Sequence, residues 1–132
     1  MLKLLLVDDE PAILEVFKEV LELSSFEVHT AKSASEALTI LQDEVFDAVA
    51  TDLRMESPLA GYQVVRAACN ISPRPTIALV TAFPVPSSEW RQAGVDALFV
   101  KGHNTIRLGE DLLQLVNSRP SEFAPAQVQD NP

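Results

Sequence analysis

Apolar residues recur along the chain in short blocks that alternate with stretches of helical periodicity. Leu2–Val7 is a nearly continuous apolar run, which predicts a strand buried on both faces. Beyond it, Leu14, Phe17 and Leu21 recur at the spacing of one helix face. The chain therefore opens with a strand followed by an amphipathic helix.

The same alternation continues to residue 118. Further strands are predicted at Phe26–Ala31, Asp47–Thr51, Thr76–Val80 and Ala97–Val100. Helices are predicted after the capping-box pair Ser33 and Glu36, and at Gly61–Asn70, Ser87–Ala93 and Ile106–Asn117. Five strands that are each followed by a helix indicate βαβ units and a parallel sheet. We expect a flavodoxin-like α/β fold, which is a doubly wound five-stranded parallel sheet with helices on both faces.

The last residues have a different character. From Arg119 to Pro132, proline occurs among Ser, Gln, Asn and Ala, and apolar periodicity is absent. Such a composition is typical of a disordered tail or a linker. We therefore expect one domain over residues 1–118 and a tail or linker over residues 119–132.

Charge and composition narrow the class of protein. A net charge of −9 with only 10 Lys and Arg argues against direct binding of nucleic acid or a membrane surface. The leucine-rich start is too short for a signal peptide and runs directly into Asp8–Glu10. No apolar run approaches the roughly 20 residues that span a bilayer. Cys69 stands alone and cannot form an internal disulfide. These features predict a cytoplasmic protein.

Five polar residues follow the predicted strands at their carboxyl ends. Asp8 and Asp9 come after the first strand, Asp52 after the third, Thr81 at the end of the fourth and Lys101 after the fifth. Parallel strands bring these ends to one edge of the sheet, where this fold binds ligands. Carboxylates in contact there repel by about 4 kcal/mol per pair, and a divalent cation removes that repulsion. Carboxylate oxygens suit Mg²⁺.

This set of residues also fits phosphoryl transfer. An aspartate can act as a nucleophile and form an acyl phosphate, and Asp52 is the candidate. The Lys101 ammonium, the Thr81 hydroxyl and a bound cation would neutralise and position the phosphoryl group. These residue types also have purely structural interpretations. Acidic residues favour helix starts, threonine favours strands, and a lysine is most often a solvated surface residue.

Four segments resemble the motifs of one family, the response-regulator receiver domains of two-component signal transduction, which include the chemotaxis regulators. The segments are Leu5–Pro11 (LLVDDEP), Ala48–Met55 (AVATDLRM), Thr81–Phe83 (TAF) and Phe99–Lys101 (FVK). The resemblance extends over about residues 2 to 118. It is specific because separate motifs agree in order and, nearly, in spacing.

The resemblance implies a role for each matching residue. Asp52 would accept a phosphoryl group from a sensor histidine kinase or a phosphotransfer protein, while Thr81 and Lys101 would contact that group. Arg54 and Phe83 would stand where the family tunes the lifetime of the phosphoryl group. The implied magnesium ligands are Asp8, Asp9, Asp52 and the backbone carbonyl of Arg54. The protein would catalyse only its own phosphorylation and dephosphorylation. It would signal to a downstream protein partner or a missing effector domain, and homodimers are common in the family.

The sequence departs from the family pattern in two regions. Glu56 stands where the family usually has proline, and Gly61 comes one residue late. Gly102 replaces the proline that usually follows the lysine, here Lys101, and Leu98 takes a place that is often aromatic. We expect Glu56 to face water rather than to tune the metal affinity. The altered Leu98–Gly102 region lies on the face that usually reports phosphorylation.

Three functions are compatible with these residues. The first is a receiver that is switched by phosphorylation of Asp52. The second is a receiver-like protein-interaction module that does not respond to phosphorylation, which the changes at Leu98 and Gly102 favour. The third is a flavin-binding or phosphohydrolase domain of similar architecture. A glycine-rich phosphate loop is absent after the first predicted strand, which argues against the third. We also expect Phe83 to belong to the core.

Overall fold

The computed structural model describes residues 1–102 and 105–118. The elements in chain order are β1 (Leu2–Val7), α1 (Pro11–Leu23), β2 (Phe26–Ala31), α2 (Ala34–Asp43), β3 (Ala48–Thr51), α3 (Ala60–Cys69), β4 (Thr76–Thr81), α4 (Ser87–Ala93), β5 (Ala97–Val100), the 3₁₀ helix η1 (Thr105–Arg107) and α5 (Leu108–Asn117). Every element predicted from the sequence is present, with ends that differ by one or two residues. The predicted tail, residues 119–132, lies outside the described residues.

The five strands form one parallel sheet in the order β2-β1-β3-β4-β5. The order of the strands reverses between β1 and β3, which makes this pair the topological switch point of the sheet. Val7 pairs with Thr51, and Thr81 pairs with Val100, so the strands end together at one edge. The predicted flavodoxin-like, doubly wound sheet is confirmed.

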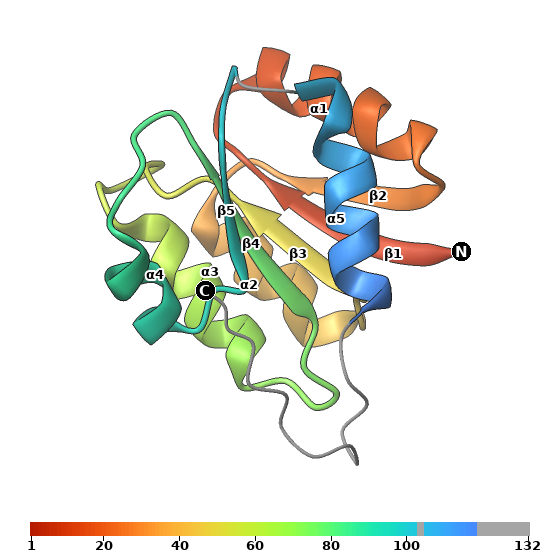
Figure 1. Ribbon diagram of the computed structural model, residues 1–132. Coiled ribbons are helices and arrows are strands. Elements are labelled where there is room, and N and C mark those ends of the chain that lie inside the picture. The colour runs from red at the N-terminus through yellow and green to blue at the C-terminus, as the bar shows by residue number, and fades with distance from the viewer. Residues whose placement is uncertain (103–104, 119–132) are drawn as a thin grey trace.

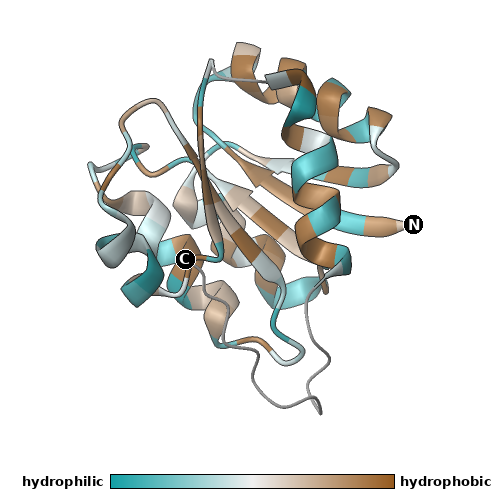
Figure 2. Ribbon diagram, in the orientation of Figure 1, coloured by the Kyte–Doolittle hydropathy of each residue, from teal (hydrophilic) through white to brown (hydrophobic). Residues whose placement is uncertain are grey.

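Helices cover both faces of the sheet, with α1 and α5 on one face and α2, α3 and α4 on the other (Figure 1). Leu4 and Leu6 of β1 pack with Phe17 of α1 and Leu112 of α5. Alternate residues of the same strands point to the opposite core, beneath α2, α3 and α4. Figure 2 shows the strands as apolar, whereas the outer faces of the helices carry polar residues. Within the described ranges, no helix is long and apolar enough to cross a membrane.

Local sequence signals explain two of the helices. The Ser33 hydroxyl accepts a hydrogen bond from the Glu36 N–H at 3.0 Å, as the capping pattern predicts. The Glu36 carboxylate accepts from the N–H of Lys32 at 2.6 Å, one residue before the cap. Helix α4 has only seven residues and begins after Pro86, in agreement with the short helix expected there.

Candidate functional site

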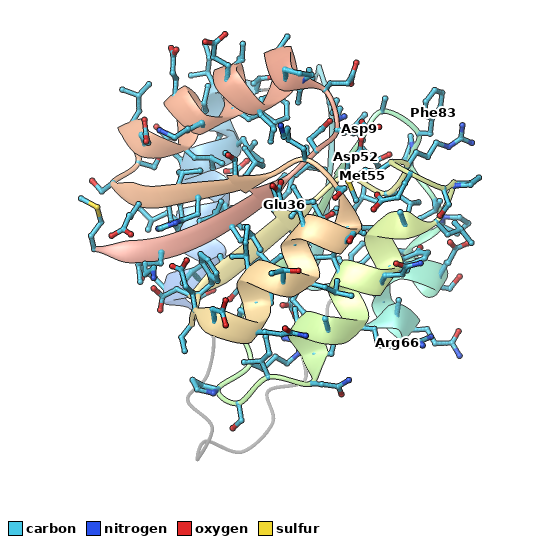
Figure 3. The ribbon with its side chains drawn as sticks, turned by 180° about the vertical axis from the view of Figure 1, so that it is seen from behind. Asp9, Glu36, Asp52, Met55, Arg66 and Phe83 are labelled. Atoms are coloured by element: carbon cyan, nitrogen blue, oxygen red, sulfur yellow. The ribbon has the colours of Figure 1, made fainter. Side chains whose placement is uncertain are left out.

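Three carboxylates gather at the switch point of the sheet. Asp8 and Asp9 follow β1, and Asp52 follows the neighbouring strand β3. One oxygen of each carboxylate lies within 4.8 Å of the others. Asp8 and Asp52 are 2% and 7% exposed, whereas Asp9 is exposed to solvent. Figure 3 shows Asp9 and Asp52 together at this edge. The structure thus brings the three predicted aspartates into one cluster.

Backbone hydrogen bonds hold Asp8 at the end of β1. Its N–H donates to the carbonyl of Ala31 at 3.1 Å, which extends the pairing with β2 by one residue. Its Oδ1 accepts from the N–H of Glu10 at 3.0 Å. Glu10 is the N-cap of α1, and the start of that helix has no side-chain cap. The alternative that Asp8 and Asp9 serve as helix caps is therefore not supported.

Asp52 is held in the same manner from the adjacent strand. Its N–H donates to the carbonyl of Val7 at 2.8 Å. Its Oδ1 accepts from the N–H of Leu53 at 2.7 Å. These two bonds fix the backbone and one carboxylate oxygen, while Oδ2 faces Lys101.

The Lys101 ammonium lies between two of the aspartates. Its Nζ is 2.7 Å from Asp8 Oδ2 and 2.8 Å from Asp52 Oδ2, and its side chain is only 11% exposed. Glu10 is more distant, with Oε1 at 3.6 Å. Burial alone would lower the pKa of Lys101, but the hydrogen bonds with Asp52 and Asp8 outweigh it and raise the pKa. Lys101 is thus a largely buried counter-ion and not a solvated surface lysine.

Burial disfavours the charged form of the Asp8 carboxyl group as well, and for an acid this raises the pKa. Loss of solvent raises the pKa of Asp8, although the hydrogen bonds from Lys101 and from the Glu10 N–H act to lower it. The raised pKa of Lys101 favours its charged form, whereas the raised pKa of Asp8 favours its neutral form. The ionised form of Asp8 remains costly in this site, and a divalent cation would relieve that cost.

Thr81 is the last residue of β4 and is 1% exposed. Its Oγ1 accepts a hydrogen bond from the Phe83 N–H at 3.1 Å and lies 3.4 Å from the Phe83 carbonyl oxygen. Its carbonyl accepts from the N–H of Lys101 at 2.8 Å. Thr81 thus occupies the expected edge, with its hydroxyl engaged by the β4–α4 loop.

An exposed aromatic ring stands at the rim of this site. Phe83 is 59% exposed, so the expectation that it belongs to the core is wrong. The Arg54 guanidinium lies 4.6 Å from the centre of the Phe83 ring, a cation–π distance. Figure 3 shows Phe83 beyond Asp52 at the same end of the molecule. Phe83 lies in the β4–α4 loop, outside the strands and helices that line the two cores, and its contact with Arg54 joins this loop to the β3–α3 loop.

The displaced glycine lies against the candidate phosphoacceptor. A Cβ added at Gly61 would stand 2.2 Å from the carbonyl oxygen of Asp52 and 2.7 Å from the Cα of Leu53. The Gly61 N–H donates to the Leu53 carbonyl at 2.8 Å. Only glycine allows this close approach of α3 to the end of β3. The longer loop therefore keeps a glycine in contact with Asp52.

The donor atoms of the cluster fit a hard divalent cation. Asp8, Asp9 and Asp52 offer only carboxylate oxygens, which is the chemistry that Mg²⁺ selects. The exposure of Asp9 leaves one side open to water, and Mg²⁺ usually keeps several of its waters. The residues present therefore fit magnesium.

Comparison with known proteins defines the class. The family model of the response regulator receiver domain matches residues 4–112 of this chain. The chain belongs to this family, the receiver domains of two-component signal transduction.

Two curated relatives are transcriptional regulatory proteins. One is the alginate biosynthesis transcriptional regulatory protein AlgB of Pseudomonas putida, 51% identical over 53 residues, which are 40% of this chain and 12% of that protein. The other is the transcriptional regulatory protein GlrR of Escherichia coli, 35% identical over 79 residues, or 60% of this chain and 18% of that protein. The chain thus matches less than a fifth of the length of either relative.

Solved structures agree in fold over most of the chain. The CheY-like receiver domain protein of Methanospirillum hungatei superposes with a TM-score of 0.79 at 27% identity, covering 89% of this chain and 94% of that one. The response regulator TrrA of Thermotoga maritima, in complex with Mg²⁺-BeF, gives a TM-score of 0.76 at 31% identity, covering 87% and 99%. Both support a receiver domain.

Proposed function

We propose that this chain is a phosphorylation-switched receiver that accepts a phosphoryl group on Asp52. One observation carries the proposal. The Asp52 carboxylate is nearly buried among two further aspartates, and one of its oxygens lies 2.8 Å from a buried lysine ammonium. Buried charge is costly. Charged side chains gathered at the ligand-binding edge are therefore not expected of residues that serve only the fold.

The proposed reaction uses Asp52 as the nucleophile. A carboxylate oxygen of Asp52 forms a bond to phosphorus, and the bond between phosphorus and the histidine nitrogen of the donor breaks. The electron pair of the broken bond leaves with that nitrogen. The product is an acyl phosphate, and attack by water on its phosphorus later restores the carboxylate.

Lys101 and Thr81 would respond to the new charge. The Lys101 ammonium already contacts Asp8 and Asp52, so a short movement suffices to pair it with a phosphoryl oxygen. The Thr81 hydroxyl would exchange its bonds with the Phe83 backbone for one to the phosphoryl group. That exchange releases the β4–α4 loop, and the phosphoryl group thereby favours a second arrangement of this loop and of β5.

The metal site is part of the proposal. Asp8, Asp9, Asp52 and the backbone carbonyl of Arg54 would hold Mg²⁺, which supplies neutralisation of the charge on the phosphoryl oxygens. The three carboxylates have the required spacing of oxygen atoms. The relative TrrA, which was solved in complex with Mg²⁺-BeF, supports this choice of metal.

Partners follow from the same chemistry. A sensor histidine kinase or a phosphotransfer protein would donate the phosphoryl group, in the cytoplasm. The protein would turn over no other substrate, since the phosphoryl group moves only onto and off its own Asp52. The curated relatives are transcriptional regulatory proteins, which supports an output through an effector. Homodimerisation stays a prediction.

The alternative is a receiver-like module that does not respond to phosphorylation. Leu98 is half-buried against the core beneath α2, α3 and α4, at a place where many receivers have an aromatic side chain. Gly102, which stands in place of the usual proline, has a φ of +86°. Both changes lie on the β5 side of the site, so the transmission of the signal is the step they affect.

An NMR comparison tests the switch. The ¹⁵N-labelled protein is recorded with Mg²⁺ before and after acetyl phosphate, beside Asp52→Asn. We expect new amide positions in the wild type for Thr81, Phe83 and β5, and none in the variant. Phosphorylation that left these amides unmoved would favour the unresponsive module. Equal changes in Asp52→Asn would contradict Asp52 as the acceptor.

A further inference from the structure

Glu56 bridges the β3–α3 loop to another helix. Its Oε1 accepts from the N–H of Ala34 at 2.9 Å, and its Oε2 accepts from the N–H of Ser35 at 3.0 Å. Ala34 and Ser35 are the first two residues of α2, 22 and 21 positions earlier in the chain. The expectation that Glu56 simply faces water is therefore incomplete, because its carboxylate is bound at both oxygens.

The contact completes the N-terminus of α2. The first N–H groups of a helix have no partner within the helix. Here those of Ala34 and Ser35 donate to Glu56, and that of Glu36 donates to the Ser33 hydroxyl. The positive end of the helix dipole also favours a carboxylate.

Beyond its base, the loop has two side-chain restraints, the contact of the Arg54 guanidinium with the Phe83 ring and the hydrogen bonds of Glu56. Residues 56–59 are exposed, and Met55 is the partly buried side chain that packs against the core. The base is fixed by Gly61 against Leu53, and the Met55 N–H donates to the Ser57 carbonyl at 3.1 Å. Glu56 supplies both of the side-chain hydrogen bonds recorded for residues 54–59. Figure 3 shows Glu36, near the start of α2, at the same end of the molecule as Met55 and Asp52.

From this geometry we infer that Glu56 is a positioning residue for the metal site. By holding its loop against α2, Glu56 would fix the backbone of Arg54, two residues earlier, where the proposed metal site needs it. The inference rests on the proposed function, in which the Arg54 carbonyl is a magnesium ligand. Glu56 would thereby restrain a loop that the family usually restrains with a proline at this position.

Two simpler explanations make different predictions. If Glu56 acts through its charge alone, any carboxylate at position 56 would preserve the affinity for Mg²⁺. If Glu56 only caps α2, then loss of the other cap, Ser33, would have the same consequences. Three variants separate these cases. Glu56→Asp keeps the charge but shortens the reach, Glu56→Gln removes the charge, and Ser33→Ala weakens the same helix end without touching the loop.

The experiment measures the dissociation constant for Mg²⁺ by calorimetry and the amide exchange rates of residues 54–57, together with Tm for each variant. We expect Glu56→Asp and Glu56→Gln to weaken Mg²⁺ binding by about tenfold, the scale seen when groups that support a metal ligand are removed. Exchange in the loop should accelerate in both. Ser33→Ala should lower Tm comparably but leave the affinity and the loop exchange as in the wild type.

Each contrary result has a distinct meaning. Wild-type affinity in Glu56→Asp with weaker binding in Glu56→Gln would overturn the inference in favour of charge. Equal weakening in Ser33→Ala would reduce Glu56 to a helix cap. Either result leaves the proposed function intact, because the wild type still binds Mg²⁺. Failure of the wild type itself to bind Mg²⁺ would overturn the proposed metal site and this inference with it.

Discussion

Lys101 explains how Asp8 and Asp52 can both be buried at one edge of the sheet. Its ammonium contacts Asp8 and Asp52 at hydrogen-bond distances, so the charges compensate one another before any cation binds. Buried pairs of this kind contribute little net stability, but breaking one leaves a charge that can neither reach water nor find a partner. The lysine is therefore a structural counter-ion as well as a candidate ligand for the phosphoryl group.

Replacing Lys101 by Met should expose this dependence. We expect Lys101→Met to lower the free energy of unfolding by about 3 kcal/mol without a metal, because Asp8 and Asp52 lose their shared partner. Saturating Mg²⁺ should recover most of the loss, since it binds the folded state and restores the positive charge. Urea unfolding followed by fluorescence of Trp90, the one tryptophan of the chain, measures both values. A loss that Mg²⁺ does not reduce would contradict a shared carboxylate site.

At the level of helices, a hydrogen bond between side chains joins α3 to α4. The Tyr62 hydroxyl in α3 donates to Glu89 Oε2 in α4 at 2.7 Å. Burial, and then this hydrogen bond to a carboxylate, raise the pKa of Tyr62 to about 12. The contact ties the short helix that follows the Thr81 loop to the helix that follows Asp52.

The pH dependence of stability should reveal this contact. Between the ordinary value of 10.0 and about 12, the unfolded chain loses the Tyr62 proton while the folded chain keeps it. The stabilisation is therefore complete below pH 10.0 and is lost as pH rises towards 12. Tyr62→Phe should lack this component of the loss. Absorbance of the single tyrosine follows the titration directly, and a midpoint near 10.0 in the folded protein would contradict the contact.

The start of α3 depends on the absence of a side chain at Gly61. Gly61→Ala places a methyl group 2.2 Å from the Asp52 carbonyl oxygen, so we expect a loss of up to about 3 kcal/mol and a displaced Asp52. Gly102→Ala is the matched control. Its Cβ would meet nothing within 4 Å, although the φ of +86° is strained for alanine and costs about 1 kcal/mol. Gly61 has no positive φ, so a loss in Gly61→Ala no larger than the strain in Gly102→Ala would contradict a steric limit set by the contact with Asp52.

The sequence predicted the elements well because each carries a local signal. Apolar runs mark the strands, and the Ser33 cap marks the start of α2. The carboxyl-end residues Asp8, Asp52 and Lys101 could be brought together from the alternation of strands and helices alone. The contact of Glu56 with Ala34 could not, because it joins positions 22 residues apart and has no periodic signature. The exposure of Phe83 could not be predicted either, because Phe83 lies in a loop, where no periodic pattern marks the buried positions.

For the molecule as a whole, topology explains why the site lies where it does. The reversal of strand order between β1 and β3 opens the sheet edge at Asp8 and Asp52, and β4 and β5 supply Thr81 and Lys101 beside them. Helices on both faces leave this edge as the place where polar groups can meet a ligand. The receiver fold and the candidate chemistry therefore follow from the same arrangement of strands.

The most direct test of the central claim is the intact mass of the protein after incubation with Mg²⁺ and acetyl phosphate, beside Asp52→Asn and a sample with the metal chelated. We predict the gain of one phosphoryl group by the wild type with Mg²⁺, and no gain by the variant or without the metal. A phosphoryl group on Asp52→Asn, or a wild type that neither acetyl phosphate nor a histidine kinase can label, would contradict the assignment of Asp52 as the phosphoacceptor.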